Sequence, residues 1–127
     1  MARVVGIGGI FIKSENPARL YEWYEENLGI SRPPGETFTF SWDDFNGSGR
    51  KGYMVCSFFP NHTRYFEPSK APFMINFCVD DLAGMIARLA GRGIEVQGPE
   101  EYDYGRFAWV MDPDGNRIEL WEPPKAA

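Results

Sequence analysis

The order of predicted elements restarts halfway along this chain, and this repetition limits the possible folds more than any other feature. An apolar, β-branched run over Val4–Lys13 predicts a strand, and Asn16-Pro17 then provides an N-cap and first-turn proline for a helix that Gly29 ends. A second predicted strand, Ala71–Val79, precedes Asp80-Asp81 and another helix with apolar residues at helical spacing. About three short strands are expected after each helix.

Short matches between the two halves support a duplication. FIKSENPARL aligns with FCVDDLAGMI, LGI with RGI, and FEPS with WEPP. Chance similarity between two strand–helix units is the alternative, although an EP tail closes both halves. Two copies are too few for a solenoid. The strands expected after the helices are Thr37–Trp42, Tyr53–Phe59 and Thr63–Phe66 in the first half, and Ile94–Val96, Arg106–Met111 and Arg117–Trp121 in the second.

The segment Asp112-Pro113-Asp114-Gly115-Asn116 predicts a tight hairpin turn. Proline presets the backbone, aspartate side chains bond to it locally, and glycine accepts the left-handed conformation. If Asp112 and Asn116 flank this loop, Glu119 lies opposite Trp109 and Trp121 lies opposite Phe107. One carboxylate then stands on an aromatic-lined face, and a shift of one residue would exchange the two faces of the strand.

Charge and histidine content exclude several classes of function. Thirteen Lys+Arg against eighteen Asp+Glu give a net charge of −5, a poor match to nucleic acid or an anionic membrane. No apolar run has the roughly 20 residues of a membrane helix, so we expect a cytoplasmic protein. The single histidine, His62, cannot form a two-His or three-His metal site. Cys56 and Cys78 are expected to be free, buried thiols in a reducing compartment.

The opening GGIFIKSENPARLYEWYEENLG, the restart INFCVDDLAGMIARLAGRGIEV and the ending FAWVMDPDGNRIELWEP resemble the vicinal oxygen chelate superfamily. This group includes glyoxalase I, extradiol dioxygenases, fosfomycin-resistance enzymes and bleomycin-resistance proteins. The resemblance covers essentially the whole chain, and the ending is its most specific part. It implies one α+β domain over 1–127 with two βαβββ modules, about 1–69 and 70–127. Their curved mixed sheets would form a cup, often completed across a homodimer.

Most metal-ligand positions of this superfamily fall on residues in this chain that do not bind metal ions. Metal-dependent members use the starts of the two module-opening strands, the glutamate of the IEL ending and, in some cases, the last strand of the first module. Here those positions fall on Gly9 (or Gly8 if one residue is inserted), Met74, Glu119 and Arg64. One carboxylate with a glycine, a thioether and a guanidinium does not hold a divalent ion. The resemblance therefore implies a degenerate metal site, and we expect no cofactor.

Several residues are candidates for the cup. His62 lies two residues before Arg64 and either faces the cup or is solvated in a loop. Arg64 and Glu119 occupy corresponding positions in the two halves, so they either form a structural ion pair or both contact a ligand. Trp109 and Trp121 either pack in the core or stack on a ligand. Three further residues are candidates for the lining. Phe11 lies on the same strand face as Gly9, Asn76 lies on the same face as Met74, and Arg106 lies at the start of the penultimate strand, near the mouth of the cup.

Two functions follow from this reading. The first is metal-independent binding of a small aromatic or cationic molecule in an acidic aromatic cup, as in bleomycin-resistance proteins. The second is a lyase, isomerase or dioxygenase that uses a metal, or uses Glu119 as its catalytic base. A small-molecule ligand and a second copy of the chain are the expected partners, and nucleic acid is not.

Overall fold

Both helices begin at capping residues that the sequence predicts, and the first helix also ends at its predicted glycine. In the computed structural model, which describes residues 2–44, 47, 49 and 51–124, Asn16 accepts a hydrogen bond from the Arg19 amide at the start of α1 (Pro17–Leu28). Gly29 ends that helix in the left-handed conformation, with φ of 71°. Asp81 caps the start of α2 (Leu82–Gly91) through the Gly84 amide.

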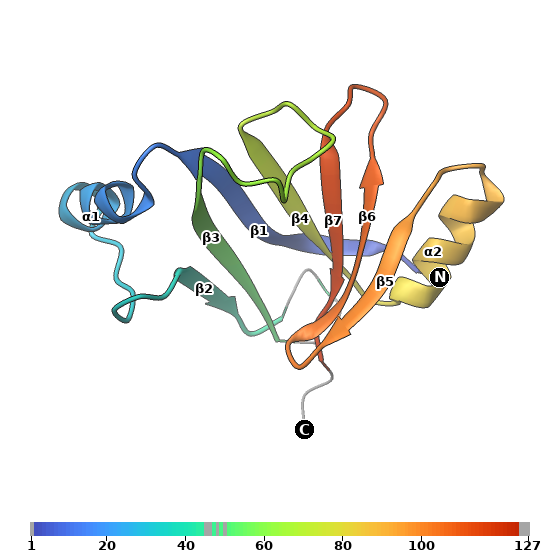
Figure 1. Cartoon of the computed structure of the whole chain (residues 1–127). Coiled ribbons are helices and arrows are strands. Elements are labelled where there is room, and N and C mark those ends of the chain that lie inside the picture. Colours follow the sequence, from blue (N-terminus) through green and yellow to red (C-terminus); the bar gives the residue numbers. More distant parts are fainter. Residues whose placement is uncertain (1, 45–46, 48, 50, 125–127) are drawn as a thin grey trace.

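The described part of the chain forms one mixed sheet of seven strands in the order β2-β3-β1-β4-β7-β6-β5. At its centre, β1 (Val4–Ser14) pairs antiparallel with β4 (Phe73–Val79), so the strands that open the two halves of the chain lie side by side. The remaining strands are β2 (Phe38–Trp42), β3 (Gly52–Pro60), β5 (Gln97–Tyr102), β6 (Gly105–Met111) and β7 (Arg117–Glu122). Figure 1 shows a strongly curved sheet with both helices outside the hollow, which confirms the expected mixed α+β fold.

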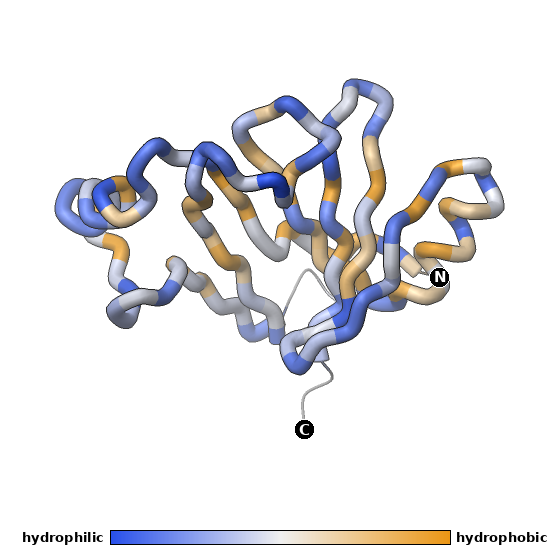
Figure 2. The backbone as a smooth tube through the Cα atoms, viewed as in Figure 1, coloured by the Kyte–Doolittle hydropathy of each residue, from blue (hydrophilic) through white to orange (hydrophobic). Residues whose placement is uncertain are grey.

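Alternating residues on β6 and β7 serve two different faces of the sheet. Ala108 and Leu120 pack with α2 residues such as Leu82 on the outer face. Phe107, Trp109 and Trp121 belong to a second buried cluster on the inner face. This two-residue period is the direct consequence of the strand pleat. The tube in Figure 2 is hydrophobic along much of the strands and hydrophilic at several turns between them.

Two expected strands do not form. Thr63–Phe66 lies among successive turns between β3 and β4, where the Thr63 amide donates to the Pro60 carbonyl oxygen and the Glu67 amide to that of Arg64. These local bonds replace the ladder bonds that a strand would make, so the described residues between α1 and β4 form two strands rather than three. Ile94–Val96 is also not a strand, because the Ile94 amide donates back to the Leu89 carbonyl oxygen as α2 ends. The division into modules 1–69 and 70–127 remains a prediction.

Neither α1 nor α2 combines the length and hydrophobicity that a membrane-crossing helix requires. Cys56 and Cys78 are free, as expected; Cys78 is buried, whereas Cys56 is only partly buried.

Candidate functional site

The hollow of the sheet contains a cavity of about 610 Å³ with an aromatic wall. Residues from both halves of the chain line it, because β1, β3, β4 and the second-half strands all present side chains to the same face. Among the described residues its charged lining consists of two carboxylates, Glu100 and Glu119, without Lys or Arg. Nine of the lining side chains are aromatic: Phe11, Tyr53, Phe59, Tyr65, Tyr102, Tyr104, Phe107, Trp109 and Trp121.

Glu119 on β7 is the deep carboxylate of this cavity and is only 2% exposed. Its Oε1 accepts a hydrogen bond from Asn76 Nδ2 at 2.6 Å, and its Oε2 accepts one from Trp109 Nε1 at 2.8 Å. The Tyr65 hydroxyl also donates to Oε2. Sheet register explains two of these contacts, since Asn76 on β4 and Trp109 on β6 both pair directly with Glu119. A buried carboxylate requires such partners, because leaving it without hydrogen bonds would be very costly.

Tyr65 reaches Glu119 from the segment between β3 and β4. Its ring stacks on Phe59, with centroids 5.8 Å apart and planes 4° apart. The Arg117 guanidinium donates to the Tyr65 carbonyl oxygen and fixes the backbone at this point. Burial, together with the neighbouring charge of Glu119, raises the pKa of Tyr65 well above its usual value. The phenol therefore remains protonated and serves as a hydrogen-bond donor.

The floor of the cavity requires a glycine at position 8. A Cβ there would lie 2.4 Å from Asn76 Oδ1 and 2.8 Å from both Cys78 Sγ and Trp121 Cε3. A Cβ at Gly9 would instead meet Phe11 and the Val55 side chain. A shift in the β1–β4 register between Ile7 and Gly9 accounts for this placement. Gly9 pairs with Asn76 in the sheet register, whereas Gly8 is the position where a side chain would collide with that of Asn76.

The position beside Glu119 on β4 also differs from the sequence expectation. Asn76, not Met74, contacts the carboxylate. Met74 is 1% exposed and belongs to the buried cluster that contains Phe11 and Trp109. The two positions share a face of β4, and Asn76 rather than Met74 pairs with Glu119 in the sheet register.

The groups around Glu119 do not fit a divalent cation. Trp109, Asn76 and Tyr65 all present hydrogens to the carboxylate, whereas a metal requires lone pairs from several donors. Within 2–44, 47, 49 and 51–124, no group of three or more His, Cys, Asp or Glu side chains lies close enough together to hold a metal ion. The side chains around Glu119 are therefore hydrogen-bond donors to its carboxylate rather than metal ligands.

Five of the expected site residues line the cavity: Phe11, Asn76, Trp109, Glu119 and Trp121. The register expected from the hairpin turn is also observed, with Trp109 opposite Glu119 and Phe107 opposite Trp121. The turn itself forms as predicted: the Asp112 carboxylate accepts from the Asp114 and Asn116 amides, and Gly115 has a φ of 83°.

Both arginines lie outside the cavity lining, so their expected positions are wrong. The Arg64 side chain is 87% exposed, and its Nε lies 3.1 Å from a carboxylate oxygen of Glu67 rather than near Glu119. The alignment of FEPS with WEPP assumed a strand at this point, and no strand forms there. Arg106 alternates with the inward-facing Phe107, and its Nε lies 3.9 Å from Glu101. His62 is exposed, in agreement with the solvated alternative.

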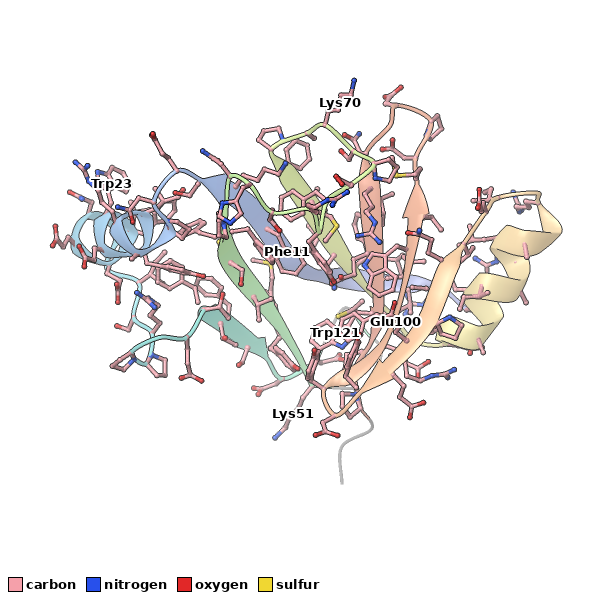
Figure 3. The ribbon with its side chains drawn as sticks, in the orientation of Figure 1. Phe11, Trp23, Lys51, Lys70, Glu100 and Trp121 are labelled. Carbon is pink, nitrogen blue, oxygen red and sulfur yellow. The ribbon has the colours of Figure 1, made fainter. Side chains whose placement is uncertain are left out.

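The rim of the cavity is formed by the turn between β5 and β6, which the sequence reasoning largely missed. Tyr102 and Tyr104 stack with ring centroids 5.3 Å apart, and the Tyr102 hydroxyl donates to Glu100. Trp121 Nε1 donates to the Tyr104 carbonyl oxygen at 2.9 Å and so attaches this rim to the floor. In Figure 3, Phe11, Trp121 and Glu100 lie toward the hollow, whereas Lys51 and Lys70 project away from it.

Comparison with known proteins identifies related folds. A family model described as a glyoxalase-like domain matches residues 9–121. Methylmalonyl-CoA epimerase from Mycobacterium tuberculosis is similar in structure, with a TM-score of 0.62, 20% identity, and coverage of 95% of this chain and 89% of that one.

Two further solved structures resemble the chain. A variant of Streptomyces coelicolor methylmalonyl-CoA epimerase, in complex with 2-nitronate-propionyl-CoA, has a TM-score of 0.67 and 18% identity, with 95% and 99% coverage. A glyoxalase/bleomycin resistance protein/dioxygenase superfamily member from Vibrio splendidus 12B01 has a TM-score of 0.57 and 16% identity, with 96% and 99% coverage. No match was found among curated proteins. At these identities the structural likeness concerns the fold.

Proposed function

The chain belongs to the glyoxalase-like domain family, and on that premise we propose that it binds a small aromatic or cationic molecule in its cup without a metal. One observation carries the proposal. The described lining of the 610 Å³ cavity combines nine aromatic side chains with two carboxylates and contains no Lys or Arg. Such an apolar, concave site with a few polar groups is typical of small-molecule recognition.

The charge of the lining favours a cation. Aromatic rings attract cations through the negative charge of their faces, and the effect is larger where water is excluded. Glu119 adds a full negative charge at the bottom of the cavity. A planar aromatic portion of the ligand would bury its surface against rings such as Trp109 and Trp121. A protonated amine or amidine on an aromatic framework fits both features.

The same lining argues against the ligand class found in the epimerase complex. CoA esters carry several phosphate charges, which proteins usually bind with guanidinium, ammonium or helix N-termini. The described lining of this cavity offers neither guanidinium nor ammonium. We therefore propose that this chain binds a different class of molecule from that of its structural relatives.

Metal independence rests on the contacts of Glu119. Both of its oxygens accept hydrogen bonds from side chains of the protein, so few of their lone pairs are left to coordinate a metal ion. The enzymatic alternative, with Glu119 as a base, remains an untested prediction. Turnover of a small-molecule substrate by metal-free protein, lost in Glu119→Gln, would support it.

Calorimetric titration with matched naphthalene compounds tests the proposal. We expect 1-naphthylmethylammonium to bind about 10-fold more tightly than neutral 1-naphthalenemethanol, because a partly desolvated cation–π or charge-assisted contact is worth roughly 1–2 kcal/mol. Anionic 1-naphthylacetate and acetyl-CoA should bind more weakly than either compound.

Two variants make the test specific. Glu119→Gln preserves shape but removes the charge, and should abolish the preference for the cation. Glu101→Gln is the matched control, because Glu101 is exposed, pairs with Arg106 and lies outside the cavity lining. Preferential binding of the anions, or equal binding of all four compounds, would contradict the proposal.

A further inference from the structure

The second carboxylate, Glu100, lies at the other end of the cavity from Glu119. In the sheet register Glu119 pairs with Trp109 on β6, whereas Glu100 on β5 pairs with Phe107 on β6. The path between the two carboxylates therefore crosses two strand spacings and two residues along the strand. With spacings of about 4.8 Å and 3.4 Å, the two Cα atoms lie about 12 Å apart along the sheet.

Glu100 faces the cavity, whereas its neighbour in sequence does not. Glu100 lines the cavity beside the stacked rings of Tyr102 and Tyr104. Glu101 points to the opposite face, where it pairs with Arg106. A cation at the rim would thus meet a carboxylate and two phenol rings. In Figure 2 the turn that joins β5 and β6 is coloured as hydrophilic, consistent with an accessible rim.

A strip of stacked rings joins the two carboxylates. The Phe107 ring lies 6.0 Å from that of Trp121 with planes 5° apart, and 6.4 Å from that of Trp109 with planes 15° apart. All three side chains line the cavity. A flat aromatic framework can lie along such a strip while charged groups at its ends reach the carboxylates.

We infer that the cavity has two cation subsites and takes an elongated aromatic dication, with one cationic group near Glu119 and the other near Glu100. This inference rests on the proposed function and specifies its ligand class. Glu100 is exposed and Glu119 is buried. The rim subsite is therefore the weaker and more salt-sensitive of the two, because water and ions screen a surface charge.

The test compares two amidines on one framework by calorimetric titration at low and high salt. The dication is 4′,6-diamidino-2-phenylindole, and the monocation is 2-phenylindole-6-carboxamidine, which lacks the amidine on the phenyl ring. We expect the dication to bind about 3- to 10-fold more tightly, as one added rim contact allows. Glu100→Gln should remove this advantage without weakening the monocation. Glu101→Gln should retain it, and Glu119→Gln should weaken both compounds.

The outcomes separate the inference from the proposed function. Equal affinity of the two amidines, no binding of either, or an advantage that survives Glu100→Gln would overturn the inference while 1-naphthylmethylammonium still binds. An equal loss in Glu100→Gln and Glu101→Gln would also overturn it, because a general surface field would then explain the advantage. If the naphthyl cation and both amidines fail to bind, the proposed function fails and this inference with it. Glu100 is exposed, so its variant should fold, as a melting curve would verify.

Discussion

Gly8→Ala adds a single methyl group against Asn76 and Trp121, two residues that line the cavity. The new Cβ would lie 2.4 Å from Asn76 Oδ1 and 2.8 Å from Cys78 Sγ and Trp121 Cε3. Asn76 cannot retreat freely, because its Nδ2 is held 2.6 Å from Glu119. Overpacking costs about 1–3 kcal/mol, and disturbing a hydrogen bond to a buried charge adds about 1 kcal/mol or more. We therefore expect a loss of about 2–4 kcal/mol in the free energy of unfolding.

Urea unfolding and thermal melting measure this loss. For a chain of 127 residues, each kcal/mol corresponds to about 4 °C, so the melting temperature should fall by roughly 8–16 °C. Gly91→Ala is the control, since a Cβ there meets nothing within 4 Å. Alanine at this position in α2 should be neutral or stabilising by up to about 1 kcal/mol. If Gly8→Ala proved as stable as Gly91→Ala, the close packing of Asn76 on β1 would be refuted.

Four other predictions concern the site and its surroundings. Tyr65→Phe keeps the stack on Phe59 but removes a donor to Glu119, so chemical denaturation should show a loss of about 1–2 kcal/mol; an unchanged stability would contradict the hydrogen bond. Burial raises the pKa of Cys78 to about 12, so its contribution to stability is present below about pH 9 and is lost as pH rises towards 12, by at most about 1.4 kcal/mol per pH unit. In Cys78→Ala the free energy of unfolding should decrease less steeply above about pH 9. An equally steep decrease would mean that other groups cause it. Elemental analysis after incubation with Zn²⁺, Ni²⁺, Fe²⁺ or Mn²⁺ should find no stoichiometric metal, whereas one equivalent per chain would reverse our reading of the donor set. Sedimentation equilibrium should show the homodimer expected from the family resemblance, and a monomer at all concentrations would rule it out.

The second half of the site was predictable from sequence because a single turn fixes its register. Asp112 and Gly115 have strong local preferences, and strand alternation then places Trp109, Glu119 and Trp121 on one face. Local rules of this kind need no knowledge of distant contacts. They also placed the helix boundaries at Asn16 and Gly29 correctly.

The first half of the site could not be predicted in the same way. Tyr65 reaches the cavity from turns, where no periodic rule relates sequence to direction. Aligning FEPS with WEPP selected Arg64, whose next neighbour, Tyr65, is the residue in contact with Glu119. Glu100 and Tyr102 are two residues apart, a spacing that places two side chains on the same face of a strand. The sequence therefore contained evidence for this part of the rim. Asn76 was identified as a lining residue, whereas its pairing with Glu119 depended on the order of β4 and β7 in the sheet.

The alternation along β6 and β7 has a consequence for how such a protein can diverge. Ala108 and Leu120 hold α2, whereas Phe107, Trp109 and Trp121 face the cavity from the same strands. Substitutions on the inner positions change ligand preference while the outer positions keep the helix in place. Selection can therefore act on recognition and on the scaffold as largely separate traits. A family built in this way can acquire new ligands by replacing side chains at every second residue, with its backbone unaltered.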